Sequence, residues 1–267
     1  MPYFKSKDSC RIYYEHHDFD SANPVVVFLN GTTQTTRTWG LTVRRLKKRI
    51  RFLLYDARGQ GHSDMGPSDL TLDGHVDDLL QLLDHLAVNR AHIVGLSHGA
   101  RVACRFGALN PERTGRMILC GLGRNLDSRT TAFLNSWIHI LNSGGFEAML
   151  WSMLPLMFGE PYLEQHRSKM DDMVAAIVQR NQAEAVKAHL KAMIRYLPVT
   201  EPIAETFPPT LIVAGNQDLV VSKDQSRALA KMLGAHLMQL KGVGHSPNME
   251  APEAFNQILL QFLLEAN

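Results

Sequence analysis

The decapeptide from Ala91 to Ala100, AHIVGLSHGA, constrains the fold of this chain more than any other stretch. A short apolar run leads into Gly95-Leu-Ser97-His-Gly99, and a segment of helical character follows. In this strand–turn–helix context, the G-x-S-x-G pattern predicts a sharp turn that lifts the hydroxyl of Ser97 away from the sheet. A side chain at either glycine would collide with the neighbouring strand or helix. The alternative is a serine between two glycines in an ordinary loop. The motif alone does not distinguish the two, so other parts of the sequence have to support one of them.

Strand and helix patterns alternate along most of the 267 residues. Solid apolar runs are typical of strands buried on both faces of a parallel sheet. Such runs occur at 25–29, 51–55, 117–120 and 210–214. A last strand is predicted over 235–240, and the β-forming segment 10–19 predicts an antiparallel edge strand. Helical spacing is found at 73–86, 225–233 and 251–266. This alternation predicts the α/β class, with a mostly parallel, doubly wound sheet.

The alternation of strand and helix patterns stops over residues 124–207, where no strand and several amphipathic helices are predicted. Helix-breaking residues punctuate this segment at Gly144-Gly145, Pro155, Gly159-Glu-Pro161 and Pro198. An insertion after a parallel strand emerges at the carboxyl edge of the sheet, above the crevice in which ligands bind. We therefore expect a core domain made of 1–123 and 208–267, and a separable helical cap made of 124–207.

Reactive residues occur in the loops after several predicted strands, at the edge where such loops gather into one crevice. Ser97 lies on the elbow, Asp218 follows the strand after the insertion, and His245 follows the last strand. Ser, Asp, His is the chain order of catalytic triads on this architecture. Asp218 could instead be an ordinary turn residue. The nearest competing carboxylate, Asp224, falls within a predicted helix, and the agreement of three loops favours the triad.

The three side chains would divide the chemistry of nucleophilic catalysis. A serine hydroxyl needs an adjacent base at neutral pH, and His245 would take its proton and later return it to the leaving group. Asp218 would hold the imidazole in the right tautomer and stabilise its cationic form. The backbone N–H groups of Thr32 and His98 would bind the developing oxyanion. With His245 as the base, kcat/KM should rise through a pKa in the region of ~6–7.

The charge balance and the cysteine content narrow the class of protein. With 28 basic and 26 acidic residues the net charge is +2, which gives no electrostatic case for a nucleic-acid or anionic-membrane partner. Three cysteines without C-x-x-C spacing form neither a disulfide framework nor a zinc or redox motif. No apolar run is long enough for a signal-peptide core or a membrane span. We therefore expect a cytoplasmic protein that uses no metal and no organic cofactor.

Over nearly its whole length the chain resembles an α/β-hydrolase. Its segment 56–63 resembles the D-x-R-G-x-G-x-S loop common in that superfamily, and Ser97 and His245 match its nucleophile and histidine positions. Among subfamilies the chain is most similar to esterases and lactonases such as 3-oxoadipate enol-lactonase, and to RhlA-like acyl-transfer proteins. Many members carry His-Gly at the oxyanion loop, whereas this chain has Asn30-Gly31, and RhlA-like proteins have a similar Asn-Gly. Haloalkane dehalogenases and epoxide hydrolases use aspartate where this chain has serine.

The ordered triad predicts a serine hydrolase that cleaves a carboxylic ester or lactone through an acyl-enzyme. Thioester cleavage or acyl transfer, carbon–carbon bond hydrolysis and cofactor-free perhydrolysis use similar sites and stay open. A ligand-binding receptor on a hydrolase scaffold is the non-enzymatic alternative. The expected partner is a small-molecule ester, lactone or acyl substrate, and the sequence allows a homodimer.

The expected substrate pocket combines the oxyanion loop with an apolar cap. An apolar lining suits an acyl chain or a ring, and methionine adapts its shape to either. Packing of the cap helices on each other explains any one of the cap residues equally well. The residues expected to line the pocket are Asn30, Gly31, Trp137, Trp151 and Met153. Arg124 could meet a substrate carboxylate, although a surface salt bridge is the safer interpretation.

Overall fold

The structure is a computed structural model that describes residues 2–196 and 207–265. Its centre is an eight-stranded sheet with the order β1-β2-β4-β3-β5-β6-β7-β8. Strands β3 to β8 pair in parallel, whereas β1 and β2 run antiparallel to their neighbours. The strands are β1 (Tyr3–Lys5), β2 (Arg11–His17), β3 (Val25–Leu29), β4 (Arg51–Tyr55), β5 (Ala91–Leu96), β6 (Thr114–Cys120), β7 (Thr210–Gly215) and β8 (His236–Leu240). The predicted α/β class with a mostly parallel sheet is confirmed.

The amino-terminal edge of the sheet differs from the sequence prediction. Strand β2 forms within the segment 10–19, as expected, but it pairs with β4 on one side and with β1 on the other. The edge is therefore β1, and the prediction that 10–19 is the edge strand is wrong. With only three residues, β1 is too short for a periodic pattern to reveal it.

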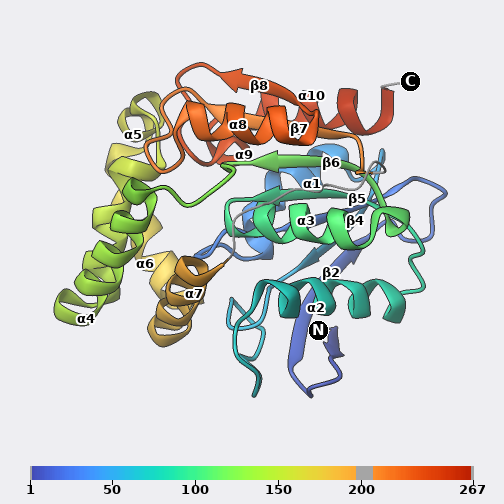
Figure 1. The fold of residues 1–267 in the computed structure, drawn as a ribbon, viewed down its shortest axis with the longest axis horizontal. Coiled ribbons are helices and arrows are strands. Elements are labelled where there is room, and N and C mark those ends of the chain that lie inside the picture. The colour runs from blue at the N-terminus through green and yellow to red at the C-terminus, as the bar shows by residue number, and fades with distance from the viewer. Residues whose placement is uncertain (1, 197–206, 266–267) are drawn as a thin grey trace.

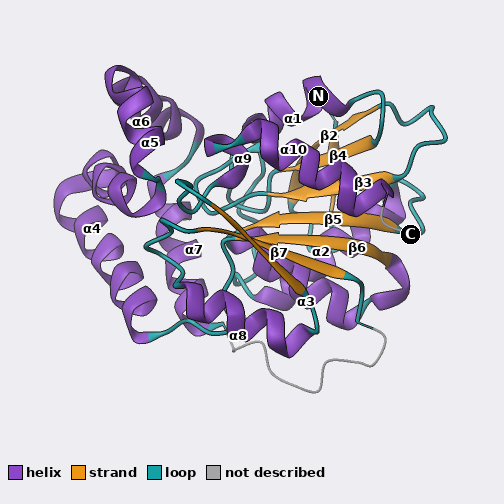
Figure 2. Ribbon diagram, turned by 90° about the horizontal axis from the view of Figure 1, so that it is seen from above, coloured by secondary structure: helices purple, strands orange, loops and turns teal. Residues whose placement is uncertain are grey.

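Helices cover both faces of the sheet (Figure 2). On one face lie α2 (Leu72–His85), α3 (His98–Leu109) and α8 (Lys223–Leu233), whose buried apolar side chains form one core cluster with residues of the strands. On the other face lie α1 (Gly40–Leu46) and α10 (Pro252–Leu260), which form a second cluster. The short elements are η1 (Thr36–Trp39), η2 (Pro111–Arg113), η3 (Arg167–Lys169), α9 (Pro247–Glu250) and a π-helical turn, η4 (Gln261–Glu265). Two covered faces explain the solid apolar runs of the central strands.

Four α-helices of the described residues lie between β6 and β7 in the chain and gather beyond the carboxyl ends of the parallel strands (Figure 1). They are α4 (Ser128–Met157), α5 (Glu160–His166), α6 (Met170–Arg180) and α7 (Ala183–Arg195). Helix α4 is interrupted at Gly145, which has a φ of 87°. Glycine adopts this angle readily, whereas other residues would be strained there. The cap helices form most of a third apolar cluster, which also includes Val220 from the loop after β7. The division into a core and a separable cap stays a prediction, and its segment 197–206, with Pro198, lies outside the described residues.

No helix in the described part of the chain is both long enough and apolar enough to cross a bilayer. The expected cytoplasmic location and the homodimer stay predictions.

Candidate active site

The turn between β5 and α3 is strained in the way the sequence motif predicts. Ser97 has φ 53° and ψ −114°, a conformation that non-glycine residues rarely adopt. A Cβ on Gly95 would lie 2.6 Å from the Cα of Ala100, and a Cβ on Gly99 would lie 2.5 Å from the carbonyl carbon of Leu29. Both glycines are therefore required by the close approach of strand and helix. The strained turn places Ser97 on the wall of a large cavity.

The acid and the histidine of the predicted triad meet in the structure. Nδ1 of His245 lies 2.8 Å from Oδ2 of Asp218, and both side chains are almost fully buried. The other carboxylate oxygen of Asp218 accepts hydrogen bonds from the backbone N–H groups of Val220 and Val221, each at 2.9 Å. Among the described residues, Nε2 of His245 has no hydrogen-bond partner. His245 and Ser97 line the same cavity, so this nitrogen is available to a group bound there.

The loop that carries His245 is fixed by a carboxylate that the sequence reasoning missed. Glu250 accepts hydrogen bonds from the backbone N–H groups of Gly244 (2.7 Å), Ser246 (2.9 Å) and the cap residue Gly159 (2.7 Å). The backbone N–H of His245 donates to the carbonyl of Met157, the last residue of α4, at 2.7 Å. The histidine loop is therefore held on one side by its own short helix and on the other by the cap.

The electrostatics of His245 reflect a balance between burial and charge. Burial alone would lower the pKa of the imidazole, because it disfavours the charged form. The charges of Asp218 and Glu250, together with the Asp218 hydrogen bond, outweigh burial and raise the pKa above its ordinary value of 6.5. The site therefore stabilises the imidazolium that a general base forms when it takes a proton.

The oxyanion loop lies against the nucleophile, but Asn30 does not line the cavity. A Cβ on Gly31 would lie 3.7 Å from the Cβ of Ser97, and Gly31 and Thr32 are among the lining residues. The amide of Gln60 donates to the carbonyl groups of both residues, at 3.1 and 3.0 Å, which fixes the orientation of their peptide groups. Asn30 instead accepts from the indole of Trp39 and donates to the carbonyl of Tyr55. The expectation that Asn30 lines the pocket is corrected, because its amide points into the core and forms both of these hydrogen bonds there.

The cavity has a volume of about 810 Å³ and lies between the strand ends and the cap. Trp137 and Met153 line it, together with the cap residues Met173, Ile177 and Met193. Other apolar lining residues of the cap are Leu126, Leu134, Leu150, Leu154, Met157, Phe158 and Leu190. An apolar cavity of this size suits a small organic ligand.

Trp151 lies outside this cavity, which corrects another expectation. Its side chain is 39% exposed and borders a separate shallow depression beside α5. Helical geometry gives the reason, since each residue turns the helix by about 100°. One face of α4 lines the cavity through Leu150, Met153, Leu154 and Met157. Trp151 lies on a different face of the helix and therefore points away from the cavity.

A buried arginine adds positive charge to the cavity wall. Arg101, one helical turn after Ser97, is 6% exposed, and its guanidinium donates to the carbonyl of Gly123 at 3.3 Å. Among the described residues it forms no ion pair with a carboxylate, and burial lowers its pKa. A guanidinium in this position favours a ligand with an anionic or carbonyl group. Arg124, the arginine considered from the sequence, is exposed and does not line the cavity.

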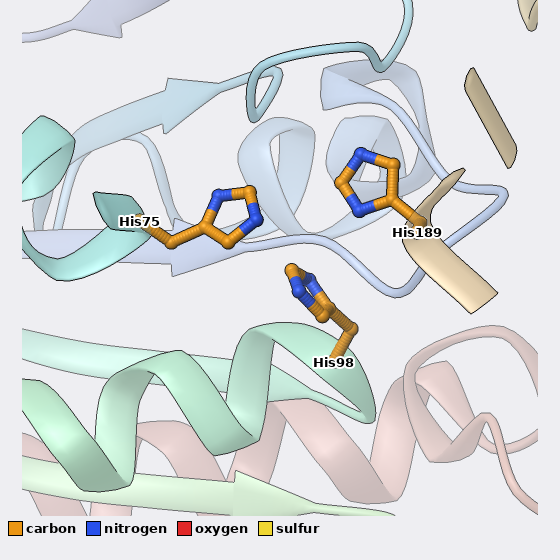
Figure 3. A group of neighbouring side chains, drawn as sticks. All are labelled: His75, His98 and His189. Carbon is orange, nitrogen blue, oxygen red and sulfur yellow. The ribbon is translucent and has the colours of Figure 1, made fainter. Parts of the chain in front are cut away.

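His98 belongs to a group of three buried histidines (Figure 3). Its partners are His75 on α2 and His189 on α7, and the ring nitrogens that could bind a metal all lie within 4.8 Å of one another. Burial lowers the pKa values of all three imidazoles, which keeps them neutral. Positions 75, 98 and 189 are too far apart in the sequence for any spacing motif to reveal this group.

Comparisons with known proteins show what the whole chain is similar to. The sequence model described as "Alpha/beta hydrolase family" matches residues 26–258. The protein "Putative carbamate hydrolase RutD" of Caulobacter sp. (strain K31) is 25% identical over 94% of this chain and 95% of its own length. The enol-lactonase of Burkholderia xenovorans LB400 superposes with a TM-score of 0.88 and 26% identity, over 98% of this chain and 99% of that chain. An esterase of Thermogutta terrifontis, with a TM-score of 0.86 and 21% identity over 99% and 98% of the two chains, shares the fold.

Proposed function

The chain belongs to the alpha/beta hydrolase family and is a hydrolytic enzyme, and from this premise we propose that it cleaves a carboxylic ester or lactone through an acyl-enzyme on Ser97. One observation carries the proposal. His245 is bound to Asp218 through Nδ1, while its Nε2 is buried without a protein partner among the described residues, in a cavity that Ser97 also lines. That is the arrangement a general base needs.

In the proposed reaction, Oγ of Ser97 attacks the substrate carbonyl while Nε2 of His245 takes the hydroxyl proton. Collapse of the tetrahedral intermediate breaks the bond to the leaving oxygen, which receives that proton from His245. Water then attacks the acyl-enzyme, with His245 again acting as the base. The acid is released and Ser97 regains its proton.

The backbone N–H groups of Thr32 and His98 would hold the oxyanion of each tetrahedral intermediate. His98 is the first residue of α3, where backbone N–H groups have no intrahelical acceptor and the helix dipole is positive. The Gln60 hydrogen bonds would keep the Thr32 side of the hole in place. Each such donor lowers the barrier by roughly 3–4 kcal/mol.

The cavity supports a substrate with an apolar acyl part and a polar or anionic group. The cap supplies the apolar wall, and Arg101 supplies a positive charge near the nucleophile. A lactone or ester is the first candidate, supported by the 26% identical enol-lactonase. A carbamate is the second, supported by the 25% identical relative named as a carbamate hydrolase. Both classes contain a carbonyl carbon that the serine hydroxyl can attack to form an acyl-enzyme.

A fluorophosphonate probe tests the nucleophile directly. The native protein is expected to be labelled in one-to-one stoichiometry, and Ser97→Ala to remain unlabelled, because phosphonylation requires an activated serine. Mass spectrometry of the labelled peptide is the measurement, and circular dichroism shows that the variant is folded. Labelling of another serine, or of none in folded protein, would remove Ser97 from the mechanism.

Product analysis separates hydrolysis from the related reactions. A panel of aryl esters, lactones, carbamates and acyl-thioesters, with and without a hydroxy-acid acceptor, distinguishes ester hydrolysis from acyl transfer. Free acid as the only product supports hydrolysis, whereas an acylated acceptor supports transfer. If the fluorophosphonate probe labels Ser97 but none of these substrates is turned over, the result would support a ligand-binding receptor on a hydrolase scaffold.

The pH profile follows from the environment of His245. Protonated His245 cannot accept the Ser97 proton, so activity is lost as the pH falls through the histidine pKa. Because the neighbouring carboxylates raise that pKa, the acid limb of kcat/KM is expected above 6.5, toward the upper end of the range expected from the sequence or beyond it. Steady-state kinetics between about pH 5 and 9 measure it. An acid limb well below 6.5 would contradict the assignment of His245 as the base.

The cap is expected to set acyl preference, and α4 offers a matched pair of variants. Met153→Ala should change the preference between an acetyl ester and a longer-chain ester by about 1–3 kcal/mol, because Met153 forms part of the cavity wall. Trp151→Ala, two residues away on the exposed face, should leave the preference unchanged. The ratio of kcat/KM values for the two esters is the measurement. Equal losses on both esters in a folded Met153→Ala protein would place the specificity pocket elsewhere.

A further inference from the structure

Three imidazole rings from distant parts of the chain converge on one space beside the active-site turn (Figure 3). His75 comes from core helix α2, His98 begins helix α3, and His189 comes from cap helix α7. The rings of His75 and His189 stack with centroids 5.5 Å apart, and the ring of His98 meets both edge-on, at 4.8 and 5.2 Å. All three side chains are buried, with 0–2% exposure.

Two nitrogens in this group have no hydrogen-bond partner among the described residues, namely Nε2 of His75 and Nδ1 of His189. A buried polar atom without a partner is destabilising, so native structures rarely contain one without a reason. The tautomer of His189 is set by its other nitrogen. Nε2 lies 2.8 Å from the carbonyl oxygen of Arg58, which can only accept, so Nε2 carries the proton and Nδ1 presents a lone pair.

This arrangement has the features of a metal site rather than of an ordinary polar contact. Metal-binding histidines commonly donate their second nitrogen to a backbone carbonyl, which fixes the ring and raises its basicity. Only neutral imidazole binds a metal, and burial lowers the pKa values of His75 and His98 well below the ordinary value and that of His189 to about 4. The positive charge of nearby Arg58 is balanced by ion pairs with Asp8 and Asp78.

We propose that His75, His98 and His189 bind one divalent transition-metal ion, for which Zn²⁺ is the best match. Three imidazoles suit zinc, and they leave a fourth position for water or for the hydroxyl of Tyr196, which lies 3.2 Å from Nε2 of His98. No carboxylate or thiol of the described residues belongs to the group. His98 lines the large cavity, which gives the ion a path of entry.

The proposed ion would join the cap to the core behind the nucleophile. Its ligands lie on α2, α3 and α7, so binding would add a link between cap helix α7 and the helix that follows Ser97. The ion plays no part in the proposed hydrolysis, and this inference does not depend on that reaction. The sequence led us to expect no metal, because it contains no ligand-spacing motif.

Titration of metal-free, tag-free protein with Co²⁺ and Zn²⁺ tests the proposal. One equivalent of Co²⁺ should bind with the visible absorption typical of a four-coordinate ion, and Zn²⁺ should displace it. His75→Gln and His189→Gln should each weaken binding at least about 100-fold, because each removes a direct ligand. His139→Gln is the matched control, since His139 is exposed on α4 and outside the group. At a Zn²⁺ concentration of about 100 times Kd, Tm should rise by about 5 °C in the native protein and in the control only.

X-ray absorption of the zinc-loaded native protein keeps the test independent of how the variants fold. Three imidazole ligands at about 2.0–2.1 Å support the site. One or no imidazole ligand, affinity unchanged by either glutamine substitution in folded protein, or no binding of one equivalent overturns the proposal. In each of those cases the three histidines are a packed cluster of neutral rings and nothing more.

Discussion

Replacing Asp218 by asparagine is expected to lower kcat by about 10⁴-fold while leaving the fold intact. The amide keeps the size of the carboxylate and can still accept from the backbone N–H groups of Val220 and Val221. It no longer supplies the charge that orients the imidazole of His245 and stabilises its cation. Kinetics on an activated ester, with the melting temperature as a check of folding, measure the effect.

Asp224 provides the matched control for this experiment. It is the nearest other carboxylate in the sequence, its side chain is 92% exposed on α8, and Asp224→Asn should leave kcat within about twofold. A second readout distinguishes an electrostatic role of Asp218 from mere support. The residual activity of Asp218→Asn should show an acid limb at lower pH than the native enzyme, because the charge that raises the His245 pKa is gone. Near-native turnover by Asp218→Asn would mean that another residue supplies the acid.

Gly99→Ala is expected to lower the free energy of unfolding by about 3 kcal/mol. The added methyl group would lie 2.5 Å from the carbonyl carbon of Leu29 and 2.7 Å from the carbonyl oxygen of Asn30. Both are backbone atoms at the end of β3, so the clash cannot be relieved by rotating a side chain. Displacing this strand end by about 1 Å would also shift the oxyanion loop and lower kcat by about 100-fold in the protein that still folds.

Gly40→Ala is the control for that substitution. Gly40 has ordinary helical angles, with φ −56° and ψ −34°, and a Cβ there would meet nothing within 4 Å. Alanine at this position should leave stability unchanged or increase it by up to about 1 kcal/mol, because it restricts the unfolded chain. Urea unfolding measures both variants. Equal stabilities for the two would show that the turn after Ser97 accommodates a side chain.

The parts of the site that sequence reasoning reached share a physical property. Each depends on local chemistry or on chain order. The elbow glycines flank Ser97 in a short motif, and Asp218 and His245 each follow a strand that the sequence predicts. The sheet then brings these loops together, and in the structure Asp218 contacts His245 as predicted. Their roles in catalysis stay predictions until the variants are measured.

The parts that sequence reasoning missed depend on side-chain direction and on long-range packing. Composition identified an apolar cap, but only the rotation of α4 shows that Met153 faces the cavity and that Trp151 does not. The sequence predicts that Asn30 lines the pocket, because nothing local reveals that its amide forms hydrogen bonds with Trp39 and Tyr55. Glu250 and the three histidines act through partners far away in the chain, and no spacing rule describes such contacts.

The hydrogen bonds between the histidine loop and the end of α4 limit how this enzyme could be recombined with its relatives. Exchanging caps among homologous hydrolases treats the inserted helices as a module with two free junctions. Here the junction also includes Met157, which accepts from the backbone of His245, and Gly159, which shares Glu250 with that loop. A chimera cut before residue 157 would import foreign backbone into the support of the catalytic histidine. Keeping residues 157–159 native, and exchanging only what precedes them in α4, would change the wall of the cavity while the loop below it stays in register.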